Sequence, residues 1–593
     1  MEKEPCELNA SLICLVDSSK TLEYENLQES LWSALDFFGI PYIKFDLATN
    51  SPSPEILKKY GAIIICQEHL GSSLSDYVIG AIVDAVKEGV GLVCFDGDLH
   101  KYKQPLKDSF GLRTTEEPTH MPHLETSSVR ILNNRHFITS RRIFEFIRFN
   151  KPVYVGNIVS IERPYSLLMI AANSSGCPVM FTETLGKGRA VFSALSPKIW
   201  LKEYLGHGGG LDDIFWRSIV WAARKPFAIL ALPPFVTIRI DDCSGAGDFE
   251  WVRILNKHGF VPHVSLFIEN IGSNGAKAIK SLYDKNAAEF SIHAFTWTKQ
   301  AYWKPRSPRD HSEGEDFADE ELTRFFKEFD ELEARWGIKW SKVFTAHFGE
   351  VGKRVMPFLK KRGIKYMGMP YAFGVPYGKS PLGLKQRIVS NLRPFGGYGG
   401  VVDRYPEDPD LFIAAPSYSD IPPTILQTLI EKKVVTPEGQ KYDFLWETAR
   451  EKVNVKLGAW YAAFGIKFCL NMLSFAVLVT HEQNISVLEN EEWDTLLTYV
   501  DRFTSKYEKI FTSWEHIAKY AENHRNVKLV SSTYDPEREE VTCLFEGESK
   551  MPLFLQVYTE QSGGIVKSYK EIPAFCGKMT LKFIPSTLLY KTV

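Results

Sequence analysis

The stretch Phe235-Val-Thr-Ile-Arg-Ile-Asp-Asp-Cys-Ser-Gly245 decides the fold of this chain. Its β-branched apolar run predicts a buried strand of a parallel sheet, and two adjacent carboxylates, Asp241 and Asp242, end it. Parallel α/β sheets place their chemistry at the carboxyl ends of the strands. Because successive strand residues point to opposite faces, we expect one carboxylate to hold a metal and the other to stay free as a base. A carboxylate pair that caps a turn is the alternative.

Three further apolar segments, far apart in the chain, each end near a histidine. They are Glu289–Trp297 with His293, Lys342–Glu350 with His347, and Ser474–Glu482 with His481. A β/α barrel brings its strand ends together at one pocket. The sequence therefore predicts that the two aspartates and these histidines share one cavity mouth.

Length and charge limit the class of protein. At 593 residues the chain is too long to form a single hydrophobic core, so about three to five domains are expected. The formal net charge of −2 gives no bulk electrostatic reason to expect nucleic acid or an anionic membrane as partner. The nine cysteines contain no CxxC pair, which argues against a disulfide framework and against a cysteine zinc site.

The amino terminus and the most apolar segment bear on location. Residues 1–7 are acidic and lack the basic-then-apolar pattern of a signal peptide. The segment from Trp460 to Thr480 is interrupted by Lys467 and Asn471, so it predicts a buried helix that runs into a strand, and no membrane span. We expect a cytoplasmic protein.

Residues 1–232 show alternating strand and helix patterns. Strands are expected at 11–16, 41–46, 61–66 and 91–96, with helices at 25–38 and 75–88. This βαβ series predicts a doubly wound, flavodoxin-like α/β domain, with short strands between about 112 and 191. The segment resembles the class I glutamine-amidotransferase-like fold. That family's nucleophile is a cysteine on a glycine-flanked elbow, whereas Cys94 lies inside an expected strand, so we expect a non-catalytic domain.

Residues 233–525 resemble the polysaccharide deacetylase family of carbohydrate esterases. The family's T-F-D-D-G motif is matched by the stretch 237–242, and its H-[ST]-x-x-H motif is matched by 293–297 at the first histidine only. Its R-x-P-Y-G motif is matched loosely by 345–349, and its final L-x-H by 477–481. The resemblance implies a distorted, incomplete (β/α) barrel. An insertion at about 371–459 is expected to cover the substrate. Residues 526–593 alternate polar and apolar positions, which predicts a small β-sandwich.

The resemblance implies a metal-dependent hydrolase that removes acyl groups, N-acetyl above all, from an amino sugar or polysaccharide. Carried over residue by residue, Asp241 is the base, His481 the general acid, and Asp242 and His293 ligands of a divalent cation, with zinc expected. Trp297 stands where the family has a second histidine, and indole cannot coordinate zinc. His347 is the candidate substitute, an absent metal is the alternative, and His311 is a weaker stand-in.

Three residues are candidates for substrate contact: Trp297, Phe348 and Arg239. Arg239 precedes Asp241 by two positions on the same strand face, so it could pair with that carboxylate in place of the family's missing arginine; a purely structural ion pair is the alternative. His263 is interpreted as a core residue. Two other functions stay open, a catalytically inactive carbohydrate-binding relative and a hydrolase of non-peptide C–N bonds in small molecules. The sequence leaves the oligomeric state open.

Overall fold

The structure is a computed structural model of the chain. It describes residues 8–114, 125–140, 145–156, 158–161, 167–172, 176–307, 310–369, 371–376, 401–404, 408–415, 428–430, 434–435, 441–442, 445–447, 453–561, 564–588 and 590–592. Across these residues, no helix combines the length and the apolar character needed to cross a membrane.

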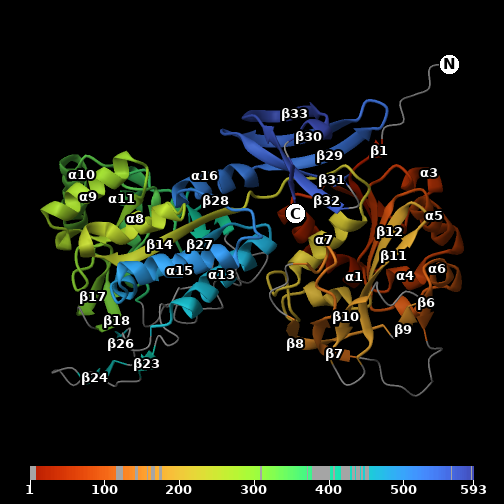
Figure 1. Ribbon diagram of the computed structural model, residues 1–593, viewed down its shortest axis with the longest axis horizontal. Coiled ribbons are helices and arrows are strands. Elements are labelled where there is room, and N and C mark those ends of the chain that lie inside the picture. The colour runs from red at the N-terminus through yellow and green to blue at the C-terminus, as the bar shows by residue number, and fades with distance from the viewer. Residues whose placement is uncertain are drawn as a thin grey trace. The chain divides into compact units, whose positions relative to one another are not determined.

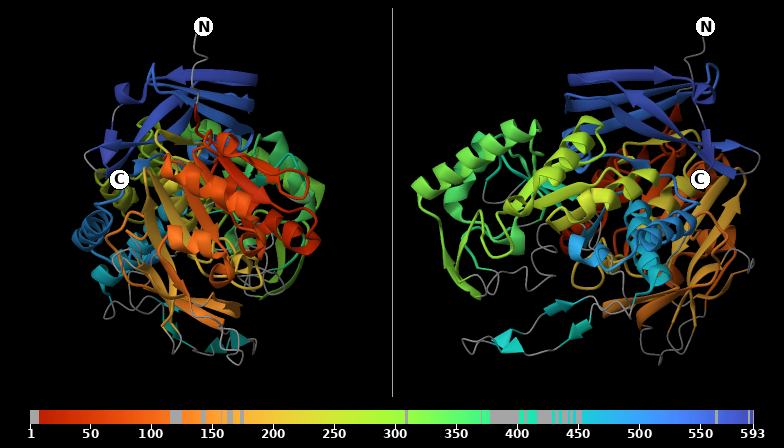
Figure 2. Two further views of the ribbon diagram at one scale, coloured as in Figure 1. Left: turned by 90° about the vertical axis from the view of Figure 1, so that its right-hand side faces the viewer. Right: turned by 60° about the vertical axis from the view of Figure 1, so that its left-hand side comes forward.

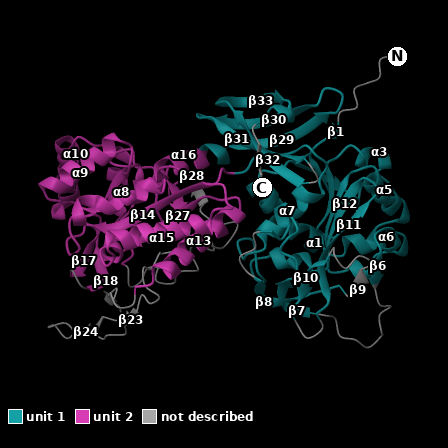
Figure 3. Cartoon of the chain, in the orientation of Figure 1, with its two compact units in different colours: residues 1–231, 394–397, 523–593 teal, residues 232–393, 398–522 magenta. Residues whose placement is uncertain are grey.

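The chain forms two compact units (Figure 3). The described part of unit 1 comes from residues 1–231 and 523–593, and that of unit 2 from residues 232–522. The carboxyl-terminal segment thus joins the unit that contains the amino terminus. The division into three domains stays a prediction.

A nine-stranded sheet forms the centre of unit 1 (Figures 1 and 2). Its strand order is β3-β2-β4-β5-β12-β11-β10-β7-β8, and its first five strands are parallel. The order of the first four strands is that of a doubly wound α/β sheet. The strands of this sheet are β2 Leu12–Val16, β3 Tyr42–Asp46, β4 Ala62–Ile65, β5 Gly91–Phe95, β7 Glu125–Ile131, β8 Phe146–Tyr154, β10 Leu167–Ala171, β11 Pro178–Leu185 and β12 Gly188–Ser193.

The burial of its central strands accounts for the parallel part of this sheet. Every residue of β2, β4 and β5 is buried, as expected for parallel strands covered by helices on both faces. The remaining four strands extend the sheet in antiparallel pairing, which confirms the short strands expected between 112 and 191. The helical segments are α1 Thr21–Glu25, η1 Gln28–Trp32, α2 Ser33–Phe37, α3 Pro54–Leu57, α4 Leu70–Ser73, α5 Asp76–Lys87, α6 Gln104–Ser109 and α7 Asp212–Ala222.

The carboxyl-terminal segment builds two antiparallel sheets, and each recruits a strand from elsewhere in unit 1. Strand β1 (Leu8–Asn9) pairs with β29, and β13 (Phe227–Ile229) pairs with β31. The sheet orders are β1-β29-β30-β33 and β13-β31-β32-β34. The segment's own strands are β29 Val527–Asp535, β30 Glu540–Ser549, β31 Leu553–Gln561, β32 Gly564–Ile572, β33 Phe575–Phe583 and β34 Tyr590–Thr592.

Unit 2 is organised around β14 (Phe235–Cys243), the strand predicted from the opening stretch. It lies in a parallel sheet of order β16-β15-β14-β27, and β28 also pairs with it. A second sheet has the order β19-β20-β22-β21, and no ladder between described residues joins it to the first. The other strands of both sheets are β15 His263–Phe267, β16 Glu289–Ala294, β19 Val343–Phe344, β20 Tyr366–Met367, β21 Val401–Arg404, β22 Phe412–Ala415, β27 Ala476–His481 and β28 Ile510–Phe511.

Helices surround these strands and contribute to one apolar core. The side chains of Val236, Ile238 and Ile240 in β14 are fully buried in it. The segment around 460–480 forms helix α13 followed by β27, which confirms the predicted helix-to-strand transition. The main helices are α8 Glu250–Lys257, α9 Ser273–Asp284, α10 Asp319–Trp336, α11 Met356–Lys361, α13 Val455–Asn471, α14 Glu482–Ile485, α15 Asn490–Phe503 and α16 Trp514–Arg525.

The predicted insertion at about 371–459 lies mostly outside the described residues. Besides β21 and β22, its described strands are β23 Thr428–Ile430, β24 Val434–Val435, β25 Lys441–Tyr442 and β26 Leu445–Glu447. Its expected function as a cover for the substrate therefore stays a prediction.

Candidate metal centre

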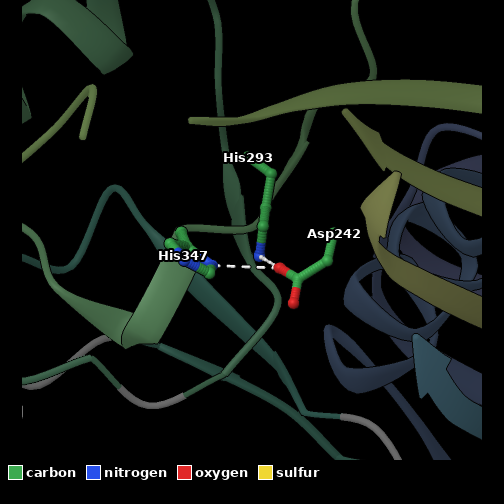
Figure 4. Close-up of side chains that lie close together, drawn as sticks. All are labelled: Asp242, His293 and His347. Atoms are coloured by element: carbon green, nitrogen blue, oxygen red, sulfur yellow. Dashed lines mark ion pairs between the residues drawn. The ribbon is translucent and has the colours of Figure 1, made fainter. Parts of the chain in front are cut away.

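Asp242, His293 and His347 converge at the carboxyl end of the parallel sheet of unit 2 (Figure 4). Oδ1 of Asp242 lies 3.2 Å from Nε2 of His293 and 3.0 Å from Nδ1 of His347. Zinc binds nitrogen and carboxylate oxygen at about 2.0–2.2 Å in tetrahedral sites, so two of its ligand atoms lie roughly 3.3 Å apart. The separations in this group therefore fit one divalent cation.

The hydrogen bonding of the group also fits a cation. Asp242 Oδ1 is buried and has no hydrogen-bond partner among the described residues, although two imidazole nitrogens lie close to it. A buried polar atom without a partner is costly and needs an explanation. A cation held by these three side chains would satisfy that oxygen.

Ring packing holds the two imidazoles in place. The ring centroids of His293 and His347 are 5.1 Å apart, and Phe267 packs against both. The far nitrogens, Nδ1 of His293 and Nε2 of His347, are buried and have no hydrogen-bond partner among the described residues. The orientation of the rings thus depends on aromatic contacts.

Two of the three candidate ligands, Asp242 and His293, lie at β-bulges. Ile240 is opposite Val264 and Cys243 is opposite Leu266, so β14 has one residue more than β15 at the Asp241–Asp242 step. In the same way β16 has one residue more than β15 at His293. A bulge turns a side chain away from regular alternation, which is why bulges occur next to active sites. The alternation expected for the two aspartates is interrupted here, at the residue whose carboxylate faces His293.

Backbone strain accompanies the bulge. Asp242 has φ = 58°, in the left-handed region that non-glycine residues seldom occupy. Phe348, directly after His347, has φ = 53°. Such conformations cost about 1 kcal/mol or more and persist only where the surroundings fix them. The strain thus lies at one candidate ligand, Asp242, and directly after another, His347.

Asp241 has a different partner from Asp242. Arg239 donates to both of its oxygens, from Nε to Oδ1 at 2.7 Å and from Nη2 to Oδ2 at 2.6 Å, and both side chains are buried. His481, the last residue of β27, is half-buried and is the direct cross-strand neighbour of Asp241. The two aspartates are therefore divided between an ion pair and the candidate metal centre.

Electrostatics favour ionised carboxylates and a neutral imidazole. Burial alone would raise the pKa of Asp241, but Arg239, with His293 and His481, lowers it to about 2. The pKa of Asp242 likewise lies well below its ordinary value, because the facing imidazoles outweigh the effect of burial. Burial lowers the pKa of His347. Carboxylate and neutral imidazole are the forms that bind metals.

The other predicted residues lie around this group. The Phe348 ring is 4.1 Å from the rings of both His347 and His311. Trp297 is 48% exposed and packs edge-on against Phe348 at 6.3 Å. His311 Nδ1 pairs with the buried Glu350 at 2.8 Å, and His311 is not one of the three grouped ligands. His347, and not His311, is therefore the third member of the group that could hold a cation.

His263 is fully buried and bonds to Glu289 and Ser291, in agreement with its interpretation as a core residue.

Sequence reasoning missed Glu482 and Gln483. Gln483 Nε2 donates to Asp242 Oδ2 at 3.0 Å, and Glu482 accepts from the backbone just after β14. Their position directly after His481 was the one available signal.

Comparison with known proteins gives no assignment. No family model and no curated protein matches the chain. Among solved structures, the exo-beta-1,4-mannosidase Op5Man5 from Opitutaceae bacterium strain TAV5 is similar at 11% identity and a TM-score of 0.23, over 38% of this chain and 36% of that one. A "putative glycoside hydrolase/deacetylase" from Parabacteroides distasonis is similar at 10% identity and a TM-score of 0.30, over 58% of this chain and 86% of that one. At these scores the function has to be inferred from the site.

Proposed function

We propose that this protein is a metal-dependent hydrolase that removes acyl groups, N-acetyl in the first instance, from an amino sugar or polysaccharide. The observation that carries the proposal is the group Asp242, His293 and His347, with its ligand atoms spaced for one cation. The motif resemblance to polysaccharide deacetylases supports the reaction class. Zinc is the cation we propose, because one carboxylate and two imidazoles suit it.

Each residue has a proposed role. Asp242, His293 and His347 would hold the cation, which when bound would polarise the acyl carbonyl and lower the pKa of a water molecule. Asp241 stays ionised at neutral pH because of Arg239, so it acts as a proton acceptor. His481, beside it on β27, is the proposed proton donor to the leaving amine.

A carbohydrate substrate is proposed from the aromatic side chains next to the cation group. Phe348 packs beside His347, and the half-exposed Trp297 packs against Phe348. Aromatic faces with a polar surround are suited to the apolar faces of sugar rings. Arg239 is buried in its pair with Asp241, so we propose that it positions that carboxylate and does not contact the substrate.

Unit 1 is proposed to be non-catalytic, as is the segment 526–593. Cys94 lies inside β5 and is fully buried, and burial raises the pKa of its thiol well above the ordinary value. A buried, protonated thiol is a poor nucleophile. The cytoplasmic location is proposed from the sequence alone.

Metal analysis combined with two variants tests the site. Asp242→Asn should lose the stoichiometric cation, because it removes the charged ligand. Asp241→Asn should keep the cation while turnover falls by about 10²–10⁴-fold, since it removes the proton acceptor. Metal content is measured by mass spectrometry on purified protein, and turnover by acetate release from acetylated glycans.

Each alternative function has its own outcome. A wild-type protein without stoichiometric zinc, cobalt or nickel would indicate the catalytically inactive carbohydrate-binding relative. A loaded protein that releases no acetate but opens small cyclic amides would indicate hydrolysis of non-sugar C–N bonds. Equal activity of Asp241→Asn and wild type would exclude the proposed base.

A further inference from the structure

The two carboxylate oxygens of Asp242 have separate partners. Oδ1 faces the two imidazoles of the cation group, whereas Oδ2 accepts a hydrogen bond from Nε2 of Gln483 at 3.0 Å. Gln483 lies in α14, two residues after His481. An amide N–H donor on Oδ2 opposes rotation of the carboxylate about its Cβ–Cγ bond. The hydrogen bond therefore selects which oxygen faces the histidines.

Glu482, which directly precedes Gln483, holds the backbone that follows Asp242. The buried carboxylate of Glu482 accepts from the backbone N–H of Ser244 at 2.6 Å and of Ala246 at 3.0 Å. These groups belong to the turn that directly follows β14. Because Asp242 has a left-handed φ, the turn after it has to be held by other contacts. Glu482 supplies such contacts from a strand end 238 residues away in sequence.

We infer that Glu482 and Gln483 are positioning residues that make Asp242 a one-oxygen ligand and keep one coordination position of the cation open. The inference rests on the proposed cation site. Three protein ligands with a free fourth position are the arrangement of catalytic zinc, whereas four protein ligands close a structural site. With Oδ2 held by Gln483, Asp242 would offer a bound cation only Oδ1, which would leave a fourth ligand position for water or for a substrate carbonyl.

The test compares Gln483→Leu with Gln104→Leu in the full chain. Gln104 is the control, because its Nε2 likewise donates to an aspartate, Asp108, at 2.6 Å, but that exposed pair lies in unit 1, not in the unit that contains the candidate cation group. Zinc affinity is measured by competition titration, and the unfolding midpoint of the cation-free proteins by thermal melting. Loss of an outer hydrogen bond to a metal ligand costs about 10–100-fold in affinity. We expect that loss for Gln483→Leu alone, with unfolding midpoints like that of wild type.

Cobalt substitution adds a readout that a structural role would not change. The visible spectrum of bound Co²⁺ reports coordination number, so release of Oδ2 in Gln483→Leu should shift it away from the four-coordinate spectrum of wild type. Glu482→Gln, which weakens the hold on the turn, should lower zinc affinity as well.

The outcomes separate the two proposals. If wild type binds zinc and Gln483→Leu binds it with equal affinity and an unchanged cobalt spectrum, the inference is wrong and the proposed function stands. If wild type binds no cation, the proposed function and the inference both fall.

Discussion

At the scale of single residues, Arg239 and Asp241 show how one ion pair can serve stability and chemistry together. The pair is bidentate and buried, and the Arg239 guanidinium also lies 5.9 Å from the ring of Trp514. Removing one member of a buried pair leaves the other charge without compensation, which costs more than the pair itself contributes. The ion pair therefore contributes to the stability of β14 and also keeps Asp241, the proposed base, ionised.

Arg239→Met should lower the free energy of unfolding by about 3–5 kcal/mol, because Asp241 is then buried without a partner. The double variant Arg239→Met/Asp241→Asn should recover most of that loss, since the amide carries no charge. Urea denaturation of both variants measures the difference. A cost below about 1 kcal/mol for the single variant would contradict the account of this pair.

At the scale of elements, two strands of unit 2 each hold an extra residue at the site. The bulge in β14 contains Asp242 and the bulge in β16 contains His293. Between them lies β15, which has no extra residue. In a regular sheet of this register, Asp241 and Asp242 would point to opposite faces. The bulge in β14 interrupts that alternation at Asp242, and the bulge in β16 does so at His293, the two residues that face each other.

Helix α16 provides a pH-dependent prediction. His524, near its end, donates from Nε2 to the carbonyl of Leu230 at 2.9 Å, and burial lowers the pKa of this histidine to about 4. Below about pH 6.5 the unfolded chain takes up this proton more readily than the folded chain. Stability should therefore fall as the pH drops from about 6.5 to about 4, by at most about 3 kcal/mol.

The control for this prediction is His524→Gln, which keeps an N–H donor for Leu230 and does not titrate. The difference in unfolding free energy between wild type and this variant, measured from pH 7 to pH 4, should shrink towards low pH as wild type loses stability. A difference that is constant across the range would show that His524 does not titrate in this way.

At the scale of the whole molecule, the carboxyl-terminal segment is part of the unit that begins the chain. Its two sheets include β1 and β13, and Arg189 pairs with Glu560 at 2.5 Å. An unpaired edge strand exposes backbone groups that invite association. Removal of residues 526–593 would therefore leave β1 and β13 without their partner strands.

A chain that ends at residue 525 should be largely insoluble, or should melt well below the full chain, because β1 and β13 lose their partners. Co-expression with a separate 526–593 fragment should restore solubility. Soluble yield, size-exclusion chromatography and thermal melting measure these effects. A truncated monomer that melts within about 3 °C of the full chain would show that the segment is an independent module.

The amino-acid pattern alone predicted the βαβ series of the first half of unit 1, the central strand β14 and the strand ends at which ionisable residues gather. Alternation, apolar runs and turn residues are local signals, so they can be read without coordinates. The same signals placed His293 and His347 at strand-to-loop junctions. They could not show which imidazole faces Asp242, because that depends on residues more than 50 positions apart.

The candidate ligand group and the contacts that support it could be seen only in the folded chain. Bulges are set by pairing between strands, and no local pattern marks the extra residue in β14 or β16. The contact of Gln483 with Asp242 joins residues 241 positions apart, and the pairing of β1 with β29 joins Leu8 to Tyr534. Such contacts depend on how distant parts of the chain pack together in the folded protein. The periodicity of the sequence contains no information about that packing.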